Sequence, residues 1–239
     1  AAALYKPGGR LAGKPTRNRM EHAGIIGRDR HHKLDHDPAA IEQLFVDLFI
    51  EAHSEPPSRI VLDLDATDDP VHGAQEGRHF HGYYDCYCYL PLYVSCGRHL
   101  LAAKLRSSSV DAADGCVAEV ARIVARIRER WPTTSIVIRA DSGFCRDDLM
   151  TWCEANAVQY VLGLAGNSRL VRKIAPELRS ARRRARRTAQ PARVFADFAY
   201  RTRKSWSSRR RVIGKAEWTL RPGLASGGGA PSKPSADET

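Results

Sequence analysis

The sequence has 239 residues, of which 43% are hydrophobic, 27% charged and 8% aromatic. These proportions are typical of globular proteins and exclude a wholly disordered, collagen-like or coiled-coil chain. No run of eighteen apolar residues occurs, so we expect no membrane span and no membrane partner. The opening residues AAALYKPGGR contain neither an initiator Met nor a charged-then-apolar leader. We therefore expect no signal peptide and interpret the sequence as cut from a longer one.

The net charge of +11 is concentrated in one segment of the chain. Residues 165–215 hold 17 Lys and Arg against 2 acidic residues, a net of +15, which leaves −4 on the remainder. An acidic polymer is the natural partner for such a segment. The alternative is a solvated, Arg-rich face that binds nothing.

Six cysteines occur without any Cys-x-x-Cys pair, and a chain of this length needs no disulfide frame. We therefore expect reduced thiols that pack as small hydrophobic side chains in a cytoplasmic protein. His72, His79 and His81 with Cys86 and Cys88 can be drawn as a zinc cluster, but their spacing matches no standard zinc finger. The loop that contains the histidines is better explained as facing a substrate.

Hydrophobic periodicity after a polar segment of residues 1–37 predicts strands and helices in alternation. The predicted elements are a helix over 38–53, a strand over 59–67, a hairpin of strands over 86–96 and 99–106, a helix over 111–130, a strand over 135–141, a helix over 146–155, a strand over 158–165, a basic helix over 167–187 and strands over 193–202 and 209–217. Three antiparallel strands followed by βαβ units predict an α/β fold with a mixed sheet covered by helices. From Leu220 the chain is rich in Gly, Pro, Ser and Ala, which predicts a disordered tail.

Two aspartates stand at the ends of predicted strands. Asp65 lies near the end of the first strand, and Asp141 closes the apolar strand that precedes a Ser-Gly turn. A charge at the end of a buried strand is costly unless it is solvated or paired, and ligand groups gather at such strand ends in α/β sheets. The alternative for Asp141 is that its side chain only caps the helix that follows.

Two aspartates brought together could hold Mg²⁺, which prefers oxygen ligands. A two-metal site of this kind serves phosphoryl transfer, and the basic segment would then hold the phosphate backbone of a nucleic acid. A metal-dependent nuclease satisfies the same pattern. Arg139 and Arg146 flank Asp141 and are either phosphate contacts or plain ion-pair partners. The best phosphate-binding candidates lie on the basic helix: Arg182, Arg183, Arg184, Arg186 and Arg187.

Several longer motifs stand out along the chain: LDLDATDDPVHG at 62–73, YCYLPLY at 87–93 and IRADSGF at 138–144, with WCEAN at 152–156, YVLGLA at 160–165 and YRT at 200–202. Together these stretches resemble bacterial insertion-sequence transposases of the DDE type. The resemblance is to the transposase group that shares an RADSGF motif around its second aspartate, and it covers roughly residues 4–217.

This resemblance implies an RNase H-like fold whose sheet carries two aspartates and a distant glutamate. In the family these residues bind two divalent ions, Mg²⁺ or Mn²⁺, and the enzyme nicks the ends of the element and joins them to target double-stranded DNA. Asp65 matches the first aspartate, with Asp63 as the alternative, and Asp141 matches the second. A bacterial, nucleoid-associated protein of the cytoplasm is expected, and self-assembly on DNA stays open.

Four segments are expected on the same basis. They are a helical and polar segment at 1–58, an RNase H-like catalytic core at 59–190, the start of a β insertion at 191–219 and a low-complexity tail at 220–239. The sequence departs from the family after Glu217, where the glutamate-bearing helix would follow. We therefore expect a truncated or frameshifted transposase that is inactive by itself. The alternative is a non-catalytic DNA-binding remnant.

Overall fold

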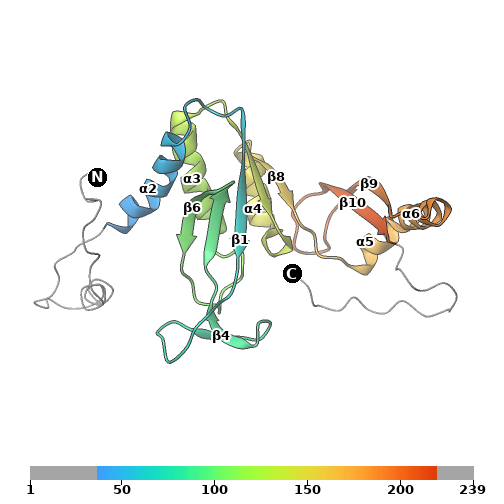
Figure 1. Ribbon diagram of the computed structural model, residues 1–239, viewed down its shortest axis with the longest axis horizontal. Coiled ribbons are helices and arrows are strands. Elements are labelled where there is room, and N and C mark those ends of the chain that lie inside the picture. Colours follow the sequence, from blue (N-terminus) through green and yellow to red (C-terminus); the bar gives the residue numbers. More distant parts are fainter. Residues whose placement is uncertain (1–36, 220–239) are drawn as a thin grey trace, which may run out of the picture. The chain divides into compact units, whose positions relative to one another are not determined.

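The computed structural model describes residues 37–219 (Figure 1). The predictions for residues 1–36 and for a disordered tail from 220 onwards lie outside these residues. The described chain divides into two compact units, one that ends at Val137 and one that begins at Ile138. Within 37–219, no helix is both long and apolar enough to cross a membrane.

The central element is a mixed, five-stranded sheet flanked by helices, which confirms the predicted α/β fold. Its strands follow the spatial order β6-β5-β1-β7-β8. Their bounds are β1 Arg59–Ala66, β5 Leu92–Cys96, β6 His99–Lys104, β7 Ser135–Ala140 and β8 Gln159–Leu162. Strand β5 pairs antiparallel with both β1 and β6, which confirms the predicted β5–β6 hairpin.

Two helices of the first unit, α2 (Pro38–Glu51) and α3 (Cys116–Arg130), pack against each other, and α2 also packs against β6. Asp37 caps α2 as predicted, since its Oδ1 accepts hydrogen bonds from two backbone amides of the first turn. Helix α3 begins five residues later than the predicted Asp111, because Gly115 precedes it in a left-handed conformation with a φ of 72°.

A buried carboxylate on α3 was not anticipated from the helical pattern. The Glu119 residue is 1% exposed, and its carboxylate binds Lys104 Nζ at 2.7 Å and the Arg122 guanidinium. Burial raises the pKa of Glu119, but the hydrogen bonds from Arg122 and Lys104 outweigh it and hold this pKa below its ordinary value. The charge is tolerated in the core because both cations reach it.

The single strand predicted over 86–96 is wrong. Leu90-Pro91 divides it into β4 (Cys86–Tyr89) and β5, and β4 lies between β2 (Asp69–Pro70) and β3 (His79–His81) in a separate three-stranded sheet. Proline has no N–H to donate to a ladder, so the chain changes sheets at this point.

The second unit carries β7 through a short 3₁₀ turn, η1 (Ser142–Phe144), into helix α4 (Asp147–Ala155) and then β8. The continuous basic helix predicted over 167–187 is wrong. It is two helices, α5 (Ser168–Lys173) and α6 (Ala175–Thr188), because Pro176 lacks an N–H and its ring excludes the carbonyl of the preceding turn.

The two late strands form a hairpin-like sheet, as predicted. Strands β9 (Ala192–Tyr200) and β10 (Arg210–Trp218) pair antiparallel along their whole length, and α6 packs against both. Ala181 and Ala185 of α6 are fully buried, so the helix lies close to the strands. Whether this hairpin begins a β insertion, and where the four expected segments divide, stays a prediction.

Candidate active site

The first candidate ligand lies on β1, where alternation separates buried from exposed side chains. Leu62 and Leu64 are buried, Asp65 is exposed, and Asp65 stands opposite Tyr93 in the ladder. Within residues 37–219, no hydrogen bond or ion pair reaches the Asp65 carboxylate. Asp63 is half-buried and is not without a partner. Of the two carboxylates, that of Asp65 is therefore the one more available to a ligand.

Tyr84 and His81 belong to the same neighbourhood, which the sequence indicated only as a substrate-facing loop. Burial raises the pKa of Tyr84, and the charges of Asp68 and Asp65 raise it further, so Tyr84 lies within electrostatic reach of Asp65. The His81 ring centroid lies 4.7 Å from that of Tyr84, and the buried His81 Nδ1 has no hydrogen-bond partner among residues 37–219. His81 and Tyr84 thus form a pair of contacting rings at the end of β3.

The second candidate ligand, Asp141, directly follows β7 and is exposed. Its Oδ1 accepts a hydrogen bond of 2.8 Å from Gly143 N, so the predicted capping role is confirmed for the η1 turn. The capping bond orients the carboxylate and occupies one oxygen. In the described part of the chain, Oδ2 accepts no hydrogen bond, so capping and ligand binding are compatible.

Gly163 supports the turn at Asp141, a role that sequence reasoning did not assign. Its amide donates to Ala140 O at 2.9 Å, directly after β8. A Cβ at this position would lie 2.7 Å from Ser142 N and 2.9 Å from the carbonyl carbon of Asp141. Only glycine therefore lets the chain pass so close to the backbone of the candidate ligand. The glycine in the YVLGLA stretch was the available signal.

Asp65 lies on β1 in the first unit, and Asp141 directly follows β7 in the second unit. Among residues 37–219 there is no group of three or more His, Cys, Asp or Glu side chains that could hold a metal ion, the histidine and cysteine cluster near β3 and β4 included. Arg139 and Arg146 are both exposed, and each already has an interaction partner. The ion-pair alternative for these two arginines therefore stays open.

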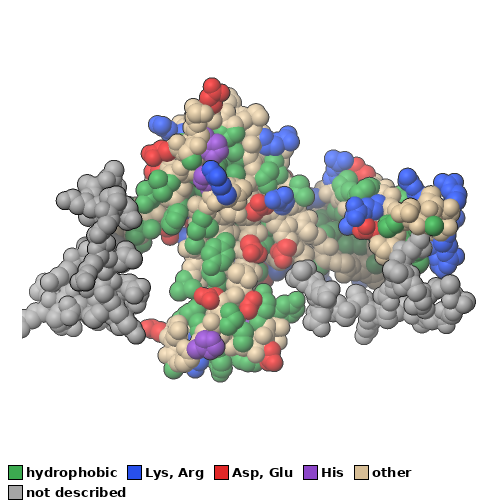
Figure 2. Space-filling model, in the orientation of Figure 1, with side chains coloured by type: hydrophobic (Ala, Val, Ile, Leu, Met, Phe, Trp, Pro, Cys, Tyr) green, Lys and Arg blue, Asp and Glu red, His purple; other side chains and the backbone are tan. Residues whose placement is uncertain are grey.

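The five arginines predicted to contact phosphates are all exposed on α6. Arg182 lies over Trp218 of β10, with its guanidinium carbon 5.0 Å from the ring centroid. In the described chain, no carboxylate forms a salt bridge with any of the five guanidinium groups. Figure 2 shows Lys and Arg side chains gathered around this part of the second unit. The row of charges is therefore available to an external anion.

These features define an α/β protein with one exposed aspartate on β1 and another directly after β7. The chain matches Transposase DDE domain group 1 over residues 2–224, and it belongs to that family. The family predicted from the sequence motifs is thereby confirmed.

Two solved structures are similar to the chain. One is the piggyBac transposase in a synaptic complex with hairpin DNA, at 15% identity and a TM-score of 0.40, with 73% of this chain and 36% of that chain covered. The other is the Mos1 transposase in a paired-end complex with the left transposon end, at 8% identity and a TM-score of 0.30, with 61% and 48% covered. The chain thus spans less than half the length of either. No curated protein matches it.

Proposed function

We propose that this protein is a DNA transposase of an insertion sequence, which cuts DNA at the ends of the element and joins them to target DNA. The observation that carries the proposal is the placement of Asp65 and Asp141. Asp65 is exposed on β1 and Asp141 is exposed directly after β7, in a chain of a DDE transposase family.

The donor set fits Mg²⁺ or Mn²⁺. Both ions bind carboxylate oxygens, and Asp65 and Asp141 each keep at least one oxygen without a hydrogen bond in the described chain. When bound, two such ions stabilise the attacking and leaving oxygens of a phosphoryl transfer. The protein's own part is to supply negative oxygen ligands and to orient them, which the Gly143 amide does for Asp141.

The metal site is tested by direct binding of Mn²⁺, measured from the loss of the free-ion EPR signal. Asp65→Asn and Asp141→Asn should each weaken Mn²⁺ binding by about tenfold or more, because each removes one charged ligand. Asn at 141 retains an oxygen that can accept from Gly143 N, so the turn should persist. The matched control is Asp69→Asn, an exposed aspartate of β2. Equal Mn²⁺ affinity in all three variants and the parent would refute the assignment.

DNA is the proposed substrate because the second unit presents a row of cations that form no salt bridge with any described acidic residue. A phosphate backbone is recognised by Arg and Lys through charge-assisted hydrogen bonds and the release of counterions. The α6 row (Arg182, Arg183, Arg184, Arg186 and Arg187) meets this description, and we include Arg139 and Arg146 as contacts close to Asp141. Such contacts hold DNA without reading its sequence.

A non-catalytic DNA-binding protein is the second candidate. It is favoured by the lack, among residues 37–219, of any group of three carboxylate, imidazole or thiol side chains around a common metal position. The family resemblance implies a glutamate as the third ligand. Both candidates share the DNA-binding surface and differ in the cutting step.

The 239-residue chain by itself should therefore produce little or no 3′-end nicking of end-labelled element DNA with Mg²⁺ or Mn²⁺. A site with two carboxylate ligands holds its metal ions less tightly, and in a less defined geometry, than a site with three. The assay should include Asp141→Asn, which reports any contaminating nuclease. Robust nicking by the parent chain that disappears in Asp141→Asn would show that the chain is a complete catalyst.

A further inference from the structure

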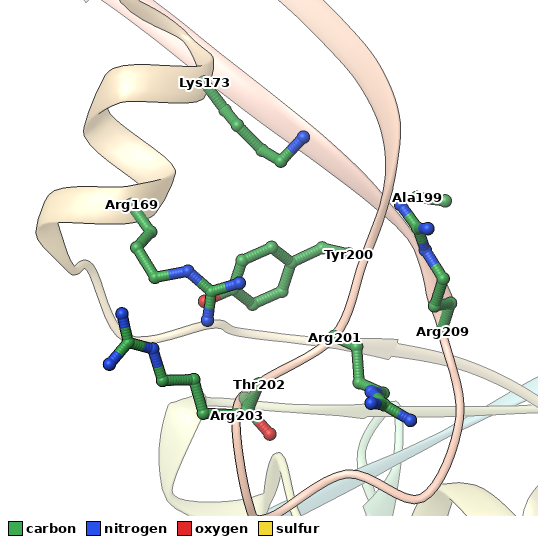
Figure 3. Close-up of a pocket in the computed structure, with 8 residues that line it drawn as sticks. All are labelled: Arg169, Lys173, Ala199, Tyr200, Arg201, Thr202, Arg203 and Arg209. Carbon is green, nitrogen blue, oxygen red and sulfur yellow. The ribbon is translucent and has the colours of Figure 1, made fainter.

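A recess in the second unit gathers five cationic side chains and no acidic one. It has a volume of about 590 Å³ and lies where α5 meets the end of β9 and the loop of residues 201–209 (Figure 3). The cations that line it are Arg169, Lys173, Arg201, Arg203 and Arg209. None of them was among the residues that the sequence indicated as DNA contacts.

The recess cations are not neutralised by the protein. Among residues 37–219, none of the five forms a salt bridge, whereas cations just outside the recess do. Arg210 binds Asp147 and Glu154, and Arg211 binds Asp197. Asp147, Glu154 and Asp197 are thus paired with arginines outside the recess. Like charges around one hollow repel each other unless an anion enters.

The floor of the recess is a buried aromatic ring, that of Tyr200. Tyr200 is 3% exposed, and the Arg169 guanidinium carbon lies 5.2 Å from its ring centroid. The Tyr200 hydroxyl also accepts a hydrogen bond of 3.3 Å from the Asn167 side chain. Figure 3 shows Arg169 extending from α5 to this ring, while the Lys173 ammonium lies 5.2 Å from the ring centroid of Phe198. A stacked guanidinium is held in place and keeps its donors for a ligand.

The loop that supplies the remaining cations is anchored at Trp206 and Ser207. Trp206 is buried against Tyr200 and Met150, and the backbone amide and hydroxyl of Ser207 both donate to Asp147 Oδ1, at 3.0 and 3.1 Å. Arg201 donates to Ser207 O at 3.5 Å, which closes the loop on itself. The cations are therefore presented on an ordered loop, which lowers the entropic cost of binding.

We propose that this recess binds a backbone phosphate of DNA. The choice of DNA as the ligand rests on the proposed function. The phosphate chemistry of the recess alone would also suit a free polyphosphate anion. Arginine forks match phosphate oxygens in geometry, and a recess of this size is large enough for a phosphate with its flanking sugars. The recess thus extends the DNA-binding surface beyond the α6 row, and its contacts do not depend on the base sequence of the DNA.

The test is DNA binding by fluorescence anisotropy over a range of salt concentrations, with two duplexes of unrelated sequence. Arg203→Gln/Arg209→Gln should weaken binding to both duplexes equally, at least several-fold, and should reduce the slope of log K against log salt by up to about 1.8, or about 0.9 for each lost phosphate contact. Arg172→Gln/Lys204→Gln is the matched control, since it removes two cations of the same segment that do not line the recess. The control should change affinity much less.

A second arm distinguishes the sources of phosphate. Inorganic pyrophosphate should compete with DNA for the parent chain and lose this effect in Arg203→Gln/Arg209→Gln. Pyrophosphate that binds in the recess without displacing DNA would overturn the proposal, as would equal losses in the recess and control variants. If the parent chain binds no DNA at all, the proposed function fails. A different result would refute the recess alone: DNA affinity that is unchanged in Arg203→Gln/Arg209→Gln but weakened in Arg183→Gln/Arg187→Gln on α6.

Discussion

Replacing Arg210 by methionine should lower the free energy of unfolding by about 2–3 kcal/mol, because Arg210 is the buried ionic link between β10 and α4. The Arg210 side chain is 4% exposed. Its guanidinium donates to Asp147 Oδ1 at 2.6 Å, to Glu154 Oε1 at 2.7 Å and to Thr151 Oγ1 at 3.0 Å. The loss stays below the roughly 3–5 kcal/mol of a fully buried pair, because the side chains of Asp147 and Glu154 keep 29% and 43% exposure and can be hydrated.

Chemical denaturation of the parent and variant chains measures this loss. Arg211→Met is the matched control, since Arg211 is the next residue and pairs with Asp197 on the surface, with 76% and 53% of the two side chains exposed. It should change stability by less than about 0.5 kcal/mol, as exposed pairs do. Equal destabilisation by the two substitutions would show that burial of Arg210 has no energetic role.

The same cluster predicts the acid dependence of stability. The pKa of Glu154 lies below its ordinary value of 4.5 chiefly because Arg210 donates to it, and that of Asp147 lies below 3.8 because the Ser207 amide and Arg210 do. Carboxylates with lowered pKa contribute stability above their ordinary pKa and lose it as the pH falls through the lowered values. The difference in stability between the parent and Arg210→Met should therefore shrink below about pH 4.

Gly163→Ala is the second substitution with a large expected effect, a loss of about 1–3 kcal/mol from overpacking. The added Cβ would lie within 3 Å of two backbone atoms, Ser142 N and the carbonyl carbon of Asp141, and backbone cannot turn aside as a flexible side chain can. The end of β8 must then move away from β7. The hydrogen bond from Gly163 N to Ala140 O should weaken, and Asp141 should be displaced.

Gly166→Ala is the control, because a Cβ there meets no atom within 4 Å. This substitution should be neutral or slightly stabilising, since it reduces the freedom of the unfolded chain. Denaturation midpoints of both variants, together with amide exchange at Gly143 and Gly163, measure the effect. Native stability in Gly163→Ala with unchanged exchange at both amides would show that the close approach is not required.

Much of the first candidate site could be predicted from local patterns. Strict alternation places Leu62 and Leu64 on one face of β1 and Asp65 on the other, and a strand has only two faces. Asp141 stands out for the same kind of reason, since it ends an apolar run before a turn. The role of Gly163 could not be derived, because the atoms that exclude its Cβ belong to residues about twenty positions earlier.

The same division applies to secondary structure. Amphipathic periodicity correctly placed α2, α4 and the β9–β10 pair, because the hydrophobic pattern of each is local. The breaks at Pro91 and Pro176 were missed, although both prolines are visible in the sequence. Alternation and helical charge spacing continue across them, and the pattern carries no information about the missing N–H.

Arg209, Arg210 and Arg211 show most clearly which properties the sequence alone does not determine. By itself it determined, to within one residue, that a strand begins at these consecutive cations, that alternate strand residues share a face, and that the surrounding segment is strongly basic. The tertiary structure decided that Arg209 lines an unneutralised recess, that Arg210 is buried between two acids of α4, and that Arg211 pairs across the ladder with Asp197. The reason is physical: identical side chains differ only in the counter-charges around them, and folding brings those from residues up to 63 positions away.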